Sequence, residues 1–286
     1  MHRQSYLKYI LALLIFASNG IVASYISLNS YEIVLLKTLI GSLLLTLIFA
    51  STRPKLAFYE HKQSLLYLAI SGVAMGITGL ALFEAYQQIG VGIPTLIHYC
   101  GPVIVMALSP ILFREKLTSI KICGFIAVLL GLFLVNKQAI NFGQPKTGLI
   151  FAGISAITFA GMVIFSKKAT DIVGLEKVVI QLICSFLTSA IFVWCKQGLI
   201  IHVEVDDWIP ILILGIVNVG LGCYLYFSSI SKLPAQTVAI CGYLETLFAL
   251  VLSALLLNER FSSIQMVGAV LIIGGTILGE VFVKKK

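Results

Sequence analysis

The chain has 286 residues, of which 59% are hydrophobic and 11% are charged, and its mean hydropathy is +1.04. Soluble domains carry about 25% charged residues, so this composition excludes a soluble globular protein and predicts an integral membrane protein in a lipid bilayer. The formal net charge of +8 would suggest a nucleic-acid partner in a soluble chain, but Lys and Arg of a membrane protein first report its topology. We therefore expect no nucleic-acid partner.

Ten apolar runs follow one another along the chain, separated by charged or turn residues. Each is close to the roughly 20 residues that a helix needs to cross a bilayer and is about twice as long as a membrane β-strand. The longest connections, 51–64 and 196–207, leave no room for a soluble domain. The sequence predicts an all-α integral membrane protein with ten transmembrane helices, over residues 6–28, 32–50, 65–85, 91–113, 119–135, 147–166, 177–195, 208–230, 235–257 and 263–283.

An even number of spans places both termini on one side of the membrane. Fifteen Lys and Arg residues lie on the side of the termini, against four on the other side, with Lys37 inside a span. Positively charged loops stay in the cytoplasm, so we expect a multi-pass protein of the cell membrane with both termini cytoplasmic.

The chain repeats itself at an offset of 144 positions. Between Leu108 and Leu134, nine of 27 ungapped positions are identical to the residue 144 positions later. This indicates two five-helix repeats, residues 1–143 and 144–286. Because five is odd, the second repeat enters the membrane inverted, which is the construction of many secondary transporters. The alternative is a duplication that only built a larger bundle.

A pattern of Pro, Glu and Gly residues in the two repeats carries a resemblance to a known family. They are Gly101-Pro102, Glu115, Gly124 and Gly131 in the first half, and Glu245, Glu259, Gly268 and Gly275 in the second. This pattern resembles the ten-helix EamA-type branch of the drug/metabolite transporter superfamily. The resemblance implies transport of small metabolites, amino acids, nucleotide-linked compounds or drugs, and favours export.

Helix-breaking residues predict where the spans bend. The fourth span contains Pro94, Pro102 and Pro110, so we expect it to bend toward a central cavity or to be kinked for packing. The ninth span has Thr246 where the family often has Pro, and we expect it to be less bent.

Ionisable side chains within the spans are costly in lipid and indicate a pathway. Lys37, Glu84 and His98 lie at a similar depth near the outer ends of their spans, where Lys37 and Glu84 could pair. Alternatively, Lys37 and Glu84 extend toward the interface and His98 is a packing residue. Glu245 lies eleven residues into its span, so it is either a functional carboxylate or a structural hydrogen-bonding group.

Neutral polar and aromatic residues complete the predicted substrate-binding set, although each could equally hold helices together. They are Asn19, Tyr99, Gln181, Asn218, Tyr224 and Tyr243. At the 144-residue offset the polar residues do not repeat, since Lys37 corresponds to Gln181 and Glu245 to Gly101. We therefore expect a symmetric frame around an asymmetric site.

These observations predict a secondary transporter that moves an amino acid or related amphipathic metabolite by alternating access. Lys37 and Glu245 would supply opposite charges, and Glu245 with His98 would couple transport to protons. A membrane-embedded enzyme acting on lipids, using Lys37, Glu84 and His98, is the alternative, and the short loops disfavour a receptor or scaffold.

The remaining expectations concern cofactors and partners. The sequence has no Cys-x-x-Cys pair, no His at metal-ligand spacing and no Gly-Lys-Ser/Thr phosphate loop, so we expect no catalytic residue, metal or cofactor. We expect Glu115 and Glu259 to form ion pairs at the membrane surface. The glycine-rich fifth and tenth spans are expected to be scaffold helices and a possible homodimer contact.

Overall fold

The computed structural model describes residues 2–52, 56–89, 92–137, 145–198, 201–257 and 262–281. Throughout these ranges the regular secondary structure is helical, and they contain no strand. Nine of the helices described there are long and apolar enough to cross a membrane, and Ser263–Gly279 is a shorter apolar helix. The predicted all-α membrane fold with ten spans is confirmed.

Two of the five spans in the first half are interrupted. In chain order the helices are α1 (His2–Ala17), α2 (Asn19–Ala23), α3 (Ser30–Ser51), the short η1 (Ala57–Tyr59), α4 (Lys62–Ile89), α5 (Gly92–His98), α6 (Cys100–Phe113) and α7 (Ser119–Asn136). The pairs α1–α2 and α5–α6 form the first and fourth spans.

The second half also has two irregular spans, the eighth and the ninth. Its helices are α8 (Lys146–Lys168), α9 (Gly174–Gln197), the short η3 (Val205–Asp207), α10 (Trp208–Ile213), the π-helix η4 (Leu214–Gly222), α11 (Cys223–Ile230), α12 (Ala235–Gly242), α13 (Leu244–Leu257) and α14 (Ser263–Val281). The segments α10–η4–α11 and α12–α13 are the eighth and ninth spans.

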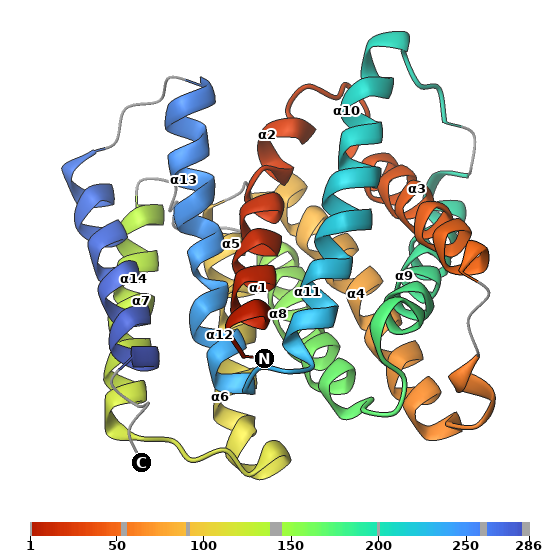
Figure 1. Ribbon diagram of the computed structural model, residues 1–286. Helices are drawn as coiled ribbons and strands as arrows, with labels where there is room; N and C mark the ends of the chain where they lie inside the picture. The colour runs from red at the N-terminus through yellow and green to blue at the C-terminus, as the bar shows by residue number, and fades with distance from the viewer. Residues whose placement is uncertain are drawn as a thin grey trace.

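The helices form a bundle in which segments from the two halves alternate. Helices α7 and α14 lie side by side at one edge, whereas α3, α4 and α9 lie together on the opposite side (Figure 1). The start of α1 and the end of α14 point to the same end of the bundle, and α2 lies at the other end (Figure 1). We call the end that holds Ser24 and Ser27 the mouth end, and the end that holds Glu115 and Asp171 the closed end.

Glycines bring α7 and α14 into backbone contact. A Cβ atom added to Gly124 would lie 2.6 Å from Gly275 O, and one added to Gly131 would lie 2.6 Å from Gly268 O. Because the 144-residue offset pairs Gly124 with Gly268 and Gly131 with Gly275, the repeat exchanges these two contacts. The glycine faces of the scaffold helices are thus occupied within one chain.

Two side-chain hydrogen bonds at opposite ends of the bundle are also related by the 144-residue offset. At the mouth end, Ser27 Oγ donates to Asp207 Oδ2 at 2.5 Å. At the closed end, Ser64 Oγ donates to Asp171 Oδ2 at 2.5 Å. Ser27 and Asp171 are equivalent at the 144-residue offset, and Ser64 lies one position from the equivalent of Asp207. The two halves therefore make related contacts at opposite ends, with donor and acceptor exchanged.

The fourth and ninth spans are interrupted at equivalent positions. Helix α5 ends before Tyr99 and α6 begins after it, while α12 and α13 are separated by Tyr243. Tyr243 Oη donates to Tyr99 O at 2.7 Å, so one interruption supports the other. The ninth span is therefore interrupted without a proline, and Thr246 lies just after the interruption. That this span is less bent than the fourth stays a prediction.

The first and sixth spans differ, although they occupy equivalent positions. Helix α8 runs unbroken over Lys146–Lys168, whereas the first span is interrupted at Ser18, between α1 and α2. There, Ile15 O accepts Ser18 N at 3.1 Å and Ser18 Oγ at 2.7 Å. This local turn uses the carbonyl that the amide of Asn19 would bond in a continuous helix.

Two lysines, one of them buried, join the helix ends at the closed end. Lys177, only 1% exposed, donates to Ser166 O, to Ala169 O at 3.2 Å and to Ser231 Oγ at 3.0 Å. Lys167 donates to Ile230 O at 3.0 Å and to Leu233 O. These bonds tie the end of α8 to the end of α11.

Glu115 caps a helix of the other half instead of forming the expected ion pair. Its carboxylate accepts Ala235 N at 2.5 Å and Gln236 N at 3.0 Å, at the start of α12. Unpaired amides and the helix dipole make this terminus favourable for a carboxylate. The expectation for Glu115 is therefore wrong, while Glu259 lies outside the described residues.

Candidate functional site

A cavity of about 680 Å³ lies between the two halves of the bundle. Its lining comes from α1, α2, α3 and α4, from the two interrupted spans α5–α6 and α12–α13, and from α8, α9, η4 and α11. Exposed Ser24 stands at its mouth, whereas Tyr9, Phe227 and Val238 on its floor are at most 3% exposed. The cavity is therefore accessible from the mouth end and blocked toward the closed end.

Glu245 provides a carboxylate in this cavity. It lies in the first turn of α13, directly after the interruption at Tyr243. The described part of the chain contains no hydrogen bond or ion pair to Glu245. A carboxylate that lines a cavity without a protein partner is available to a ligand cation.

Tyrosines from several helices surround Glu245. Its carboxylate interacts electrostatically with the hydroxyls of Tyr9, Tyr86, Tyr99 and Tyr226, all of which line the cavity. Aromatic rings and a carboxylate together favour an organic cation, through cation–π and ionic interactions. This part of the cavity forms an acidic aromatic pole.

Lys37 provides the opposite charge. Its Nζ lies 3.4 Å from Asn19 Oδ1 and 5.6 Å from the centre of the Phe83 ring, and its charge interacts with the Cys223 thiol. Within the described ranges Lys37 has no carboxylate partner. It is the cationic pole of the cavity and can accept a ligand anion.

His98 faces the cavity with one ring nitrogen already engaged. His98 Nδ1 lies 3.2 Å from Ser155 Oγ, and that hydroxyl donates its hydrogen to Ala152 O at 2.7 Å. The ring of neutral His98 must therefore donate from Nδ1, which leaves Nε2 as an acceptor. The imidazole also packs edge-on against Phe159, with ring centres 5.3 Å apart.

Asn218 lies in the π-helix η4, and its side chain forms hydrogen bonds with the residues at which the first span is interrupted. Its Nδ2 donates to Ile15 O at 2.7 Å and to Ser18 Oγ at 3.2 Å. Its Oδ1 has no partner, although the side chain is only 2% exposed and lines the cavity. Tyr226 Oη, also without a hydrogen-bond partner, lines the same cavity.

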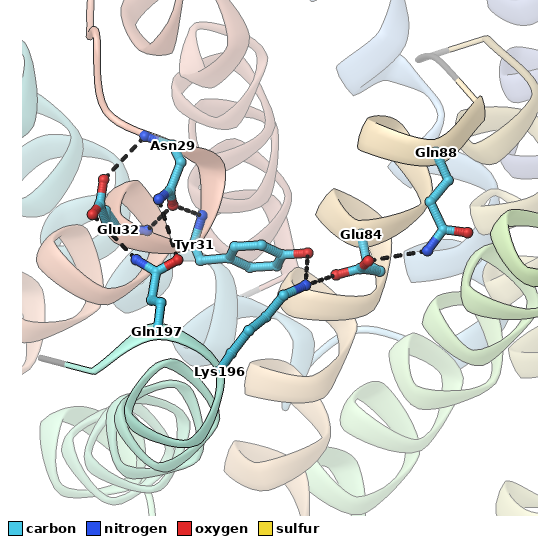
Figure 2. A network of polar contacts seen from close by, with 7 residues as sticks. All are labelled: Asn29, Tyr31, Glu32, Glu84, Gln88, Lys196 and Gln197. Atoms are coloured by element: carbon cyan, nitrogen blue, oxygen red, sulfur yellow. Dashed lines mark hydrogen bonds and ion pairs between the residues drawn. The ribbon is translucent and has the colours of Figure 1, made fainter.

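Glu84 lies outside the cavity lining, and the expected Lys37–Glu84 pair is wrong. Figure 2 shows Glu84 bound instead to Lys196 of α9, whose Nζ lies 2.5 Å from Glu84 Oε2 and 2.7 Å from Tyr31 Oη. Gln88 also donates to Glu84, at 3.0 Å. This network links α3, α4 and α9 at the mouth end, so Glu84 has a structural partner.

Three other predicted site residues lie outside the cavity lining. Gln181 is fully buried and donates to Ser71 Oγ at 2.7 Å. Tyr243 bonds Tyr99 O, and Tyr224 borders a separate apolar groove beside α3. The structure thus brings six of the ten predicted residues together in the cavity: Asn19, Lys37, His98, Tyr99, Asn218 and Glu245. Their role in substrate binding stays a prediction.

Sequence reasoning missed the tyrosines Tyr9, Tyr86 and Tyr226. At the 144-residue offset these positions correspond to Gly153, Ile230 and Leu82, respectively. The signal that could have found them is that none has an aromatic residue at the equivalent position, just as Lys37 and Glu245 have no charged residue at theirs.

Comparisons with known proteins agree with this architecture. The model of the EamA-like transporter family matches residues 4–137 and 146–279. The chain is similar to the Uncharacterized transporter YxxF of Bacillus subtilis, with 24% identity over 95% of this chain and 88% of that protein. It is also similar to Protein PecM of Dickeya dadantii, with 23% identity over 73% and 71% of the two chains. A solved crystal structure that is 15% identical in sequence matches the fold over the whole of both chains, with a TM-score of 0.86.

Proposed function

This chain belongs to the EamA-like transporter family, and we propose that it is a secondary transporter whose central cavity is exposed alternately to the two sides of the membrane. Membership makes it a membrane transporter of the drug/metabolite type. In the proposed cycle the halves 1–143 and 144–286 exchange conformations, which opens the closed end and closes the mouth end. The related contacts at the two ends support such an exchange.

The substrate is a small amphipathic metabolite, of the amino acid class or related to it. The observation that carries this proposal is the presence of Glu245 and Lys37 in one mostly apolar cavity, neither with an ion-pair partner among the described residues. Binding a ligand ammonium and a ligand carboxylate would neutralise both charges in an environment where unpaired charges are costly. An uncharged substrate would leave both charges unpaired.

The positive-inside rule supplies the orientation. With both termini in the cytoplasm of a cell membrane, the mouth end faces outward, and this conformation is the outward-open one. Export is the favoured direction because of the family resemblance. Proton coupling through Glu245 and His98 is part of the proposal, since both groups line the cavity.

A homodimer through α7 or α14 remains a prediction, but only some faces of these helices are available for it. The glycine faces of these helices contact each other within the chain. A dimer would therefore use the outward faces, where Ile126, Leu130, Val267 and Val270 are each more than half exposed.

The alternative function, a lipid-modifying enzyme, requires Lys37, Glu84 and His98 to converge near one interface. Glu84 binds Lys196 outside the cavity, so the three groups do not form one site. The geometry therefore supports the transporter.

Vesicle flux tests the proposed function. Purified protein in liposomes loaded with a panel of amino acids and small metabolites is expected to exchange at least one radiolabelled compound without altering it. Glu245→Gln should lower that flux by at least about tenfold, since a charged hydrogen-bonded contact is lost. Glu204→Gln, on an exposed connection, is the control and should retain flux.

Two further outcomes are informative. Flux that responds to an imposed pH gradient supports proton coupling, and unchanged flux indicates a uniporter or exchanger. Lipid turnover without flux of any compound would overturn the transporter and favour the enzyme.

A further inference from the structure

Asn218 joins two irregularities that occur only in one half of the pseudo-symmetric frame. Its equivalent at the 144-residue offset is Ala74, in the regular helix α4, whereas Asn218 lies in a nine-residue π-helix. Its partners Ile15 and Ser18 interrupt the first span, whose counterpart α8 is continuous. Departures from α-helical geometry of this kind occur frequently at functional sites.

The two hydrogen-bonding atoms of Asn218 have different environments. Nδ2 is saturated by Ile15 O and Ser18 Oγ, but Oδ1 is buried beside the cavity with no partner. A buried acceptor without a partner costs about 1–3 kcal/mol. A ligand that donates an N–H or O–H group to Oδ1 would remove this cost.

Asn218 lies at the Lys37 end of the cavity. Ser18, which it bonds, is followed by Asn19, whose Oδ1 lies 3.4 Å from Lys37 Nζ. The next residue after Asn218, Val219, packs against Gly41, one turn along α3 from Lys37. A ligand anion at Lys37 would therefore carry its neighbouring donor group toward Asn218.

The two charged groups have different neighbours. Lys37 Nζ lies 3.4 Å from Asn19 Oδ1 and 5.6 Å from the centre of the Phe83 ring, whereas Glu245 lies in the first turn of α13, and no ion pair joins them among the described residues. An α-amino acid whose carboxylate binds Lys37 and whose α-ammonium binds Asn218 has no further cation for Glu245. A ligand that also pairs with Glu245 therefore needs a second cation, on its side chain.

Building on the proposed transport function, we propose that Asn218 is a specificity-determining residue and that the substrate is an α-amino acid with a cationic side chain. The carboxylate binds at Lys37, the α-ammonium donates to Asn218 Oδ1, and the side-chain cation binds Glu245 within its tyrosines. A ligand lacking either amino group leaves a buried acceptor unpaired, which is the strongest means of rejection available to a binding site.

Four probes of matched shape test this assignment. They are L-lysine, 6-aminohexanoate without the α-amino group, L-norleucine without the side-chain amino group, and pentane-1,5-diamine without the carboxylate. Competition against counterflow of radiolabelled lysine in liposomes is expected to favour lysine over each of the others by at least about tenfold.

Variants then assign each discrimination to a residue. Asn218→Ala should reduce the preference for lysine over 6-aminohexanoate to less than about threefold while retaining the preference over norleucine. Asn218→Asp, which keeps an acceptor oxygen and loses Nδ2, should keep the first preference, and it also provides a readout if the alanine variant does not fold. Asn136→Ala is the matched control, because Asn136 Nδ2 donates to Leu132 O at 2.9 Å outside the cavity lining.

The outcomes separate this inference from the function on which it rests. Flux of other metabolites without any competition by lysine overturns the substrate class and leaves the transporter intact. Lysine flux with undiminished preference over 6-aminohexanoate in Asn218→Ala overturns the role of Asn218 alone. No flux of any compound in the wider metabolite panel overturns the proposed function itself.

Discussion

Two helix contacts differ in their relation to the repeat: the contact between α7 and α14, and the contact between the first and eighth spans. In the first, four glycines that the repeat interchanges bring two backbones together. In the second, Asn218 of a π-helix bonds an interrupted helix, and neither feature has an equivalent in α8 or α4. The difference indicates that the frame retains the symmetry of the repeat, whereas the cavity wall departs from it, as the proposed binding of a ligand with distinct ends would require.

Disrupting the symmetric frame should have the largest effect. Gly124→Leu would place side-chain atoms where even a Cβ lies 2.6 Å from Gly275 O, and a backbone atom cannot move aside as a flexible side chain can. We expect a loss of at least about 3 kcal/mol of stability, the upper end of overpacking costs. Unfolding in detergent by increasing denaturant measures it.

Gly274→Leu is the control for this substitution, because a Cβ at Gly274 has nothing within 4 Å. Gly268→Leu should match Gly124→Leu if the two contacts are equivalent. A large difference between these two variants would show that the frame is less symmetric than the backbone contacts indicate.

Loosening the closed end should have the next largest effect. Lys177→Met removes three hydrogen bonds that join α8, α9 and α11, and the equivalent position at the mouth end is Ile33. We expect the closed end to open roughly tenfold more often, equivalent to about 1.4 kcal/mol. A cysteine at floor residue Val238, in a chain without other cysteines, reports this as faster labelling by a thiol reagent that does not cross membranes.

The side of labelling decides the interpretation. Faster labelling from the side of the closed end supports a gating role for Lys177. Unchanged labelling with reduced thermal stability would mean that Lys177 only stabilises the fold.

A smaller effect is expected at the helix terminus that Glu115 caps. Glu115→Gln keeps the shape of the side chain but removes the charge opposite Ala235 N and Gln236 N. A charge at a helix N-terminus contributes about 0.3–1 kcal/mol and is screened by salt. The difference in Tm between the variant and the parent protein should therefore shrink as the salt concentration rises, and a difference independent of salt would contradict this account.

The sequence was sufficient to predict the frame, because apolar runs and a repeated pattern record helix length and duplication directly. It also singled out Lys37, Asn218 and Glu245, which line the cavity, since ionisable or amide groups in a span are unusual. The predicted partner of Glu84 was wrong. Its partner Lys196 lies in a different span, and the spacing of residues along the sequence does not show which helices become neighbours. The interruption at Tyr243 was missed for a similar reason, since no proline marks it and its support comes from Tyr99 O.

The smallest expected effect concerns the hydrogen bonds that the repeat relates at opposite ends. The Ser64 hydroxyl, which donates to Asp171 Oδ2 at 2.5 Å, lowers the pKa of Asp171 below its ordinary value. A carboxyl group whose pKa is lowered by folding stabilises the protein above its unfolded pKa of about 4. This contribution is lost as the pH falls through the folded pKa. Ser64→Ala should therefore lower Tm slightly at pH 7, and the difference from the parent protein should shrink at pH 3.

Ser51→Ala is the control for this pH dependence, because Ser51 Oγ bonds only Ile48 O of its own helix. Its small effect on Tm should be the same at both pH values. If Ser64→Ala behaves in the same way, then the hydroxyl stabilises the closed end without favouring the ionised form of Asp171. The bond at Ser64 would then resemble its counterpart at Ser27 in geometry alone.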